Sequence, residues 1–92
     1  MASVRGKSLK ALCFDVSEGY ATVNPIFLKS FDGDLLKDFY KELSKAQNDI
    51  RGDKFPTSDT AAIRLRNLKL QRLYSATMII RHYAKSRRIS LI

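Results

Sequence analysis

The chain has 92 residues, 45% of them hydrophobic and 10% aromatic, with a formal net charge of +8. This length predicts one domain over residues 1–92, and the composition excludes a disordered chain. The single cysteine excludes an internal disulfide, no apolar run could cross a bilayer, and the first residues lack a signal peptide's apolar stretch. We therefore expect a soluble intracellular protein with no membrane partner, in the nucleus of a eukaryote or the cytoplasm or nucleoid of a prokaryote.

The N-terminal segment, residues 6–20, permits two local structures. Its apolar side chains recur at the spacing of one helical face, at Leu9, Leu12, Cys13 and Val16. Gly19 would follow this helix at the position where glycine is favoured. The same segment could instead form a hairpin around residues 17–20. We expect the helix and keep the hairpin as the alternative.

Capping signals predict the next two helices. Asn24-Pro25 is a start signal for a short helix through Phe27 and Leu28. Asp32 or Asp34 can then cap an amphipathic helix over residues 35–50, which Gly52 ends. The apolar face of that helix comprises Leu35, Leu36, Phe39, Tyr40, Leu43, Ala46 and Ile50.

A long C-terminal helix is predicted from Thr60 to about Lys85, because this stretch contains neither glycine nor proline. Pro56 prevents helix across the connector before it, where Thr57 or Ser58 can provide a cap. The tail, residues 86–92, alternates like the start of a strand, as if the chain were a fragment or truncated subunit. The predicted fold is all-α, a small helical bundle with a long basic C-terminal helix.

This long helix carries apolar side chains on two sides. One stripe consists of Ile63, Leu70, Leu73, Tyr74, Ile80 and Ala84. The second stripe consists of Leu65, Leu68, Ala76, Ile79 and Tyr83, with Arg72 among them. A helix that is apolar on two sides must pack between other elements. The second stripe is therefore either a subunit interface or a surface that the N-terminal segment covers, and both alternatives stay open.

The positive charge is concentrated at the C-terminal end. No acidic residue occurs after Asp59, whereas the first 50 residues contain equal numbers of acidic and basic ones. In addition to Arg72, the basic residues of this region are Arg64, Arg66, Lys69, Arg81, Lys85, Arg87 and Arg88. They do not share one helical face, which argues against direct reading of a DNA groove. They could contact an acidic partner or phosphates, or simply be solvated.

Residues for catalysis or metal binding are scarce. His82 and Cys13 have no further His or Cys at metal-ligand spacing, so we interpret them as a surface imidazole and a small buried hydrophobe. The pairs Asp32/Asp34 and Asp53/Asp59 lie in turn and capping contexts. No phosphate-binding loop, dinucleotide fingerprint or nucleophile motif is present. We expect no enzyme, no metal and no cofactor.

Three segments carry a resemblance to a known family: NPIFLKSF at 24–31, DLLKDFYKELSKAQNDIR at 34–51 and IRLRNLKLQRLYSATMIIRHYAKSRRI at 63–89. In this order they resemble the helical domain of GINS subunits, replication-helicase factors of archaea and eukaryotes. In that family a proline-and-leucine segment precedes the first long helix, and a long arginine-dotted helix makes the tetramer contacts. GINS subunits are larger, however, and carry a small β-domain that this sequence lacks.

The resemblance implies a non-catalytic assembly or scaffold subunit of a helicase-associated DNA-replication complex, docking onto protein subunits through its long basic helix. The implied interface consists of Leu65, Leu68, Arg72, Ala76, Ile79 and Tyr83. The rival hypothesis is a small basic helical module that binds nucleic acid directly, through some of the seven other basic residues of the last helix and tail. A third hypothesis is a self-associating structural protein, such as a viral or phage factor.

Overall fold

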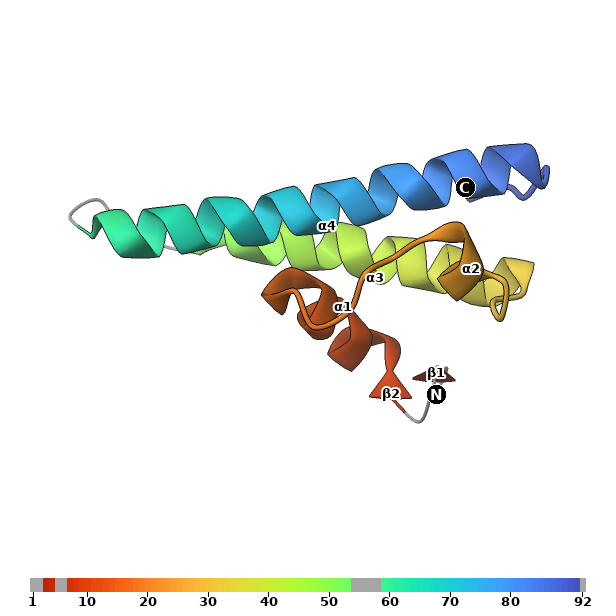
Figure 1. Cartoon of the computed structure of the whole chain (residues 1–92), viewed down its shortest axis with the longest axis horizontal. Helices are drawn as coiled ribbons and strands as arrows, with labels where there is room; N and C mark the ends of the chain where they lie inside the picture. Colours follow the sequence, from red (N-terminus) through yellow and green to blue (C-terminus); the bar gives the residue numbers. More distant parts are fainter. Residues whose placement is uncertain (1–2, 5–6, 54–58, 92) are drawn as a thin grey trace.

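The computed structural model describes residues 3–4, 7–53 and 59–91, and it has the predicted all-α fold (Figure 1). Its helices are α1 (Leu9–Glu18), α2 (Pro25–Leu28), α3 (Gly33–Gly52) and α4 (Thr60–Ser86). The helices are preceded by a minimal antiparallel ladder of β1 (Ser3–Val4) and β2 (Lys7–Ser8), which we did not predict. The described chain is elongated, with extents of 44 × 26 × 21 Å.

The first helix is confirmed, and the hairpin alternative around residues 17–20 is wrong. The Ser8 side chain accepts a hydrogen bond from the Ala11 amide and so caps the N-terminus of α1. At the other end Gly19 has a φ of 83°, and the Tyr20 amide donates to the Asp15 carbonyl at 2.8 Å. This left-handed turn ends α1 because glycine adopts positive φ without steric cost.

The predicted caps of α2 and α3 are also confirmed. The Asn24 Oδ1 atom accepts from the Phe27 amide at 2.8 Å, and the Asp32 Oδ1 atom accepts from the Leu35 amide at 2.7 Å. Asp32 is thus the cap of α3, which extends two residues beyond the prediction at each end. For α4 the cap is Asp59, whereas Thr57 and Ser58 lie outside the described residues.

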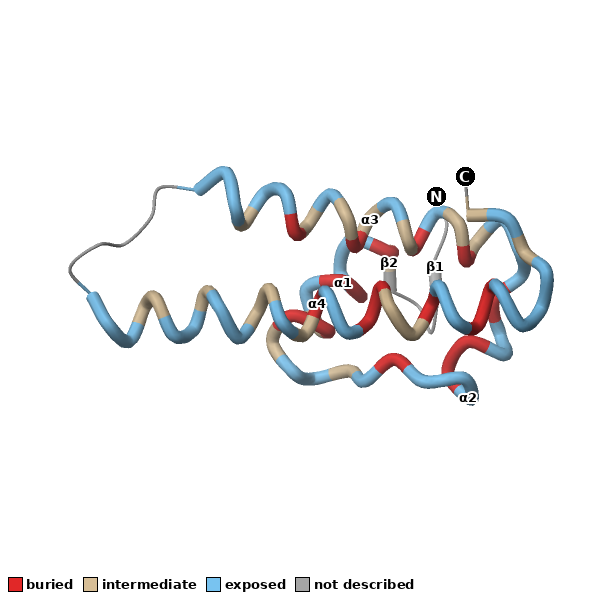
Figure 2. Tube along the Cα trace, turned by 90° about the horizontal axis from the view of Figure 1, so that it is seen from above, coloured by how far each residue is buried: buried red, intermediate tan, exposed pale blue. Residues whose placement is uncertain are grey.

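The C-terminal tail does not begin a strand, which corrects the prediction for its described part, residues 86–91. Instead Arg88 adopts a left-handed conformation with a φ of 58°, and the Ile89 amide donates to the Ala84 carbonyl at 2.8 Å. This bond pattern ends α4 and turns the chain back toward α3 (Figure 2). Ile89 and Leu91 then pack against the core, which explains their alternation with polar residues.

The core lies where α1, α3 and α4 meet, because α1 contacts both long helices. Leu36, Phe39 and Leu43 of α3 and Leu73 and Ile80 of α4 are completely buried. The short helix α2 closes one end of this core through a cluster of three aromatic rings, Phe27, Phe31 and Phe39, with centroids 5.3 to 6.4 Å apart. Figures 1 and 2 show the first turns of α4 extending past α1, with only the end of α3 beside them.

The turn at Gly19 makes a testable prediction. Gly19→Ala should lower the free energy of unfolding by about 1 to 2 kcal/mol, because a Cβ atom is disfavoured at positive φ. The added carbon would also lie 3.0 Å from the Arg72 Cζ atom. Urea unfolding followed by circular dichroism measures the change.

Gly52 provides the matched control, because no atom lies within 4 Å of a Cβ added there. Gly52→Ala should leave stability unchanged or raise it by up to about 1 kcal/mol. If the two substitutions had equal effects, the assignment of the turn at Gly19 would be wrong.

Candidate partner-binding surface

The six predicted interface residues do not share one environment. Ala76 and Tyr83 are buried in the chain's own core, and Arg72 and Ile79 are half-buried. Leu65 and Leu68, nearer the start of α4, are 48% and 40% exposed. The second stripe therefore divides along its length: its C-terminal part packs within the chain, while its N-terminal part remains available to another molecule.

A groove continues this exposed part along α4. Four of the predicted interface residues line one wall: Leu68, Arg72, Ala76 and Ile79. The opposite wall is the end of α1 and the loop that follows, including Val16, Ala21 and Val23, and the volume between them is about 410 Å³. We call Leu65, Leu68 and this groove the docking face.

Arg72, on the α4 wall of the docking face, is held in place by the end of α1. Its Nη1 atom donates to the Ser17 carbonyl oxygen at 3.0 Å, one of the last carbonyls of that helix. A helix C-terminus carries partial negative charge, which favours a guanidinium there. One turn away, Lys69 Nζ lies 3.1 Å from Glu18 Oε1. Both basic side chains thus join α4 to α1, so Lys69, predicted to contact a partner, already has an intramolecular one.

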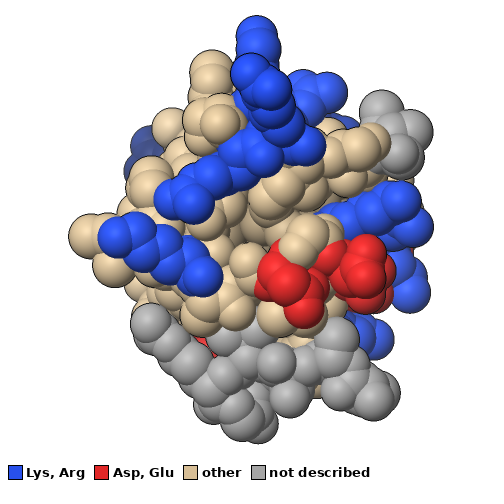
Figure 3. Space-filling view, turned by 90° about the vertical axis from the view of Figure 1, so that its right-hand side faces the viewer, with Lys and Arg blue, Asp and Glu red and all other residues tan. Residues whose placement is uncertain are grey.

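The other predicted contact residues fall into two groups. Arg64 is exposed and Arg66 half-buried near the start of α4, whereas Arg81, Lys85, Arg87 and Arg88 are exposed near its end. About 22 Å of helix separates Arg66 from Arg81, so the two groups cannot form one compact site. Figure 3 views the molecule along its long axis, from the end where α4 finishes, with basic side chains in the upper part of the view and an acidic group below them.

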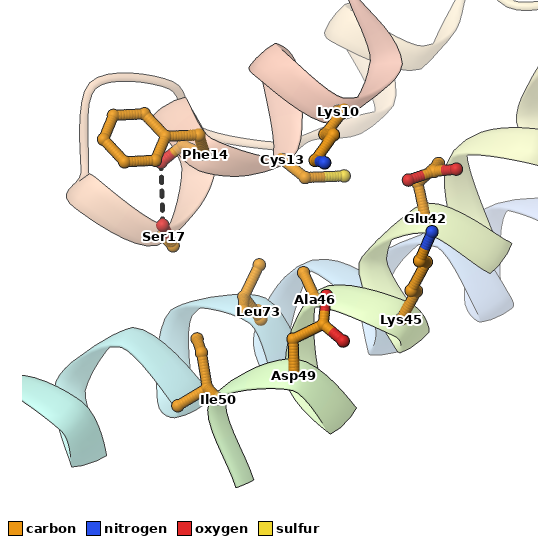
Figure 4. A pocket seen from close by; sticks show the side chains of 10 residues that line it. All are labelled: Lys10, Cys13, Phe14, Ser17, Glu42, Lys45, Ala46, Asp49, Ile50 and Leu73. Carbon is orange, nitrogen blue, oxygen red and sulfur yellow. Dashed lines mark hydrogen bonds between the residues drawn. The ribbon is translucent and has the colours of Figure 1, made fainter. Parts of the chain in front are cut away.

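A cleft between α1 and α3 was not anticipated (Figure 4). Its volume is about 210 Å³, and its apolar lining includes Cys13, Phe14, Ala46, Ile50 and Leu73. The rest of the lining consists of Ser17 and four charged side chains: Lys10, Glu42, Lys45 and Asp49. The helical spacing of Cys13 indicates its burial, but no local signal shows which residues of α3 lie opposite it.

The Cys13 thiol is buried, as the sequence predicts, and His82 is exposed at the helix surface. Burial, together with the nearby Glu42 carboxylate, raises the pKa of Cys13 to about 12. Both effects disfavour the thiolate, the reactive form of cysteine. The environment is therefore that of an inert structural thiol and not of a nucleophile.

Among the residues that the structure describes, no group of three or more His, Cys, Asp or Glu side chains could hold a metal ion. No described helix combines the length and apolar character needed to cross a membrane. Comparison of the chain with models of known protein families, with curated proteins and with solved structures finds no match.

The state of Cys13 can be checked with a thiol reagent. At pH 8 the folded protein should react at least about 100-fold more slowly than the protein in urea, because the raised pKa removes nearly all thiolate. The release of chromophore from a disulfide reagent measures both rates. Equal rates in the folded and unfolded protein would contradict the burial of this thiol.

Proposed function

We propose that the protein is a non-catalytic assembly subunit that binds another protein through the docking face. The observation that carries the proposal is the exposure of Leu65 and Leu68, which lie about one helical turn apart. Leu68 also lines the groove beside Arg72. Single exposed leucines are ordinary on protein surfaces. Two neighbours that continue a groove form the apolar centre that a protein interface requires.

The charges around the docking face favour an acidic partner. Arg64, which precedes Leu65 in the chain, is exposed, and α4 contains no Asp or Glu over Thr60–Ser86. Arginine is enriched at protein interfaces because its planar group pairs well with carboxylates. A partner surface with apolar side chains at its centre and carboxylates around them would complement this face.

The resemblance of residues 24–89 to the helical domain of GINS subunits supports the finer part of the proposal. Under it, the partner is a sister subunit of a helicase-associated DNA-replication complex. α4 is the longest helix and packs against α1, α2 and α3, which agrees with the role that the resemblance implies for it. This packing equally suits other helical assemblies, so the partner's identity rests on the resemblance.

The double substitution Leu65→Asp/Leu68→Asp tests the proposal. Both side chains are exposed, so we expect the free energy of unfolding to change by less than about 1 kcal/mol. Association should be abolished, because two carboxylates would be desolvated at the interface centre. Sedimentation velocity at physiological salt detects self-association, and affinity capture with mass spectrometry of the bound proteins detects another subunit.

Ile26→Asp is the matched control, because Ile26 is 77% exposed on α2 and does not line the groove of the docking face. It adds a carboxylate in place of an exposed apolar side chain but should leave association intact. The proposal is wrong if the wild-type chain forms no complex, or if the double variant still forms it. It is also wrong if Ile26→Asp abolishes the same complex.

A further inference from the structure

Two adjoining hollows lie where the tail turns back over α3, at the opposite end of α4 from Leu65 and Leu68. Lys37, Lys41 and Lys45 of α3 line the first, and Arg81 and Lys85 of α4 line the second. Tyr40 and Leu91 line both, so the two hollows form one continuous surface, which we call the tail groove. Their volumes are about 570 and 350 Å³.

The charge of the tail groove has one sign. Five basic side chains line it, and no Asp or Glu does so among the residues that the structure describes. Asp38 and Glu42 lie with Lys41 and Lys45 in a separate hollow between α1 and α3. These carboxylates partly offset Lys41 and Lys45, so Lys37, Arg81 and Lys85 contribute most of the positive potential.

The spacing of these cations suits a polymer better than a single anion. Lys37, Lys41 and Lys45 follow one another at four-residue intervals, and so do Arg81 and Lys85. Each interval advances about 6 Å along a helix, comparable with the distance between successive phosphates of a nucleic-acid strand. Two such rows on neighbouring helices form a track for a phosphate backbone.

Tyr40 narrows the ligand class. Its half-buried side chain lies at the junction of the two hollows, with the partly buried Leu91 beside it. An aromatic ring between rows of cations is the arrangement by which proteins hold single strands, because unpaired bases can stack on the ring. Bases inside a duplex are already stacked and cannot reach it.

From this combination we infer that the tail groove binds single-stranded nucleic acid, with phosphates on Lys37, Arg81 and Lys85 and a base against Tyr40. The interaction is separate from the proposed protein docking, because no residue of the docking face lines the tail groove. The docking face and the tail groove can therefore be tested independently of each other.

The charged track is tested by fluorescence anisotropy with a labelled oligothymidylate of about 20 nucleotides at about 100 mM salt. Lys37→Gln/Lys85→Gln should weaken binding about ten-fold. The control Lys29→Gln/Arg51→Gln has the same net charge and removes two exposed cations that line neither the tail groove nor the docking face, so it should weaken binding less than about three-fold. If the two double variants lost the same amount of affinity, the oligonucleotide would be attracted by net charge alone, and the proposed site would be wrong.

The stacking platform is tested with Tyr40→Leu and Tyr40→Phe. The leucine variant should bind the oligonucleotide at least about five-fold more weakly, whereas phenylalanine retains a ring and should stay within about two-fold of wild type. Thermal unfolding confirms that each variant is folded. Equal binding by wild type and Tyr40→Leu, or tighter binding of a duplex than of the single strand, would contradict the inference. The inference would also be wrong if the protein did not bind the oligonucleotide but bound phosphatidylserine vesicles, and if Lys37→Gln/Lys85→Gln weakened that vesicle binding about ten-fold.

Discussion

The antiparallel packing of α3 against α4 is the constraint on which the rest of the structure depends. Phe39, Leu43, Leu73 and Ile80 are completely buried between these helices and the elements that cover them. α4 has 27 residues and is about 40 Å long, but α1 and α2 together provide only 14 helical residues to cover it. The chain therefore buries the C-terminal half of α4 and leaves apolar side chains exposed near its start.

This division gives the basic residues of α4 different roles. Arg72 and Lys69 hold α4 to the end of α1, through a helix carbonyl and the Glu18 carboxylate. A surface ion pair such as Lys69–Glu18 contributes up to about 1 kcal/mol to stability. The main effect of the two contacts is therefore to position α1 and the loop that forms the groove. Near the end of α4, Arg81 and Lys85 instead face the tail groove beside Tyr40. The net charge of the C-terminal region, read from the sequence alone, does not distinguish these two roles.

Local signals account for much of what the sequence predicts correctly. Asn24, Asp32 and Gly19 act within three or four residues of themselves, so their capping roles follow from short-range geometry. The spacing of apolar residues predicts α3 and α4 correctly because it, too, depends on residues only three or four positions apart. The two stripes of α4 are different, because burial of Ala76 and Tyr83 depends on segments distant in the sequence. The tail groove was missed because it joins Lys37 to Arg81, and only the turn at Arg88 brings Leu91 between them.

Hydrogen exchange along α4 tests most directly whether this helix is divided into a packed part and a docking part. In the isolated chain, amides of residues 64–70 should exchange at least about ten-fold faster than those of residues 76–84, because the buried core protects only the latter. On assembly, protection should rise in residues 64–70 and change little in residues 76–84. Uniform protection along α4 in the isolated chain, or assembly that leaves residues 64–70 unprotected, would contradict this division.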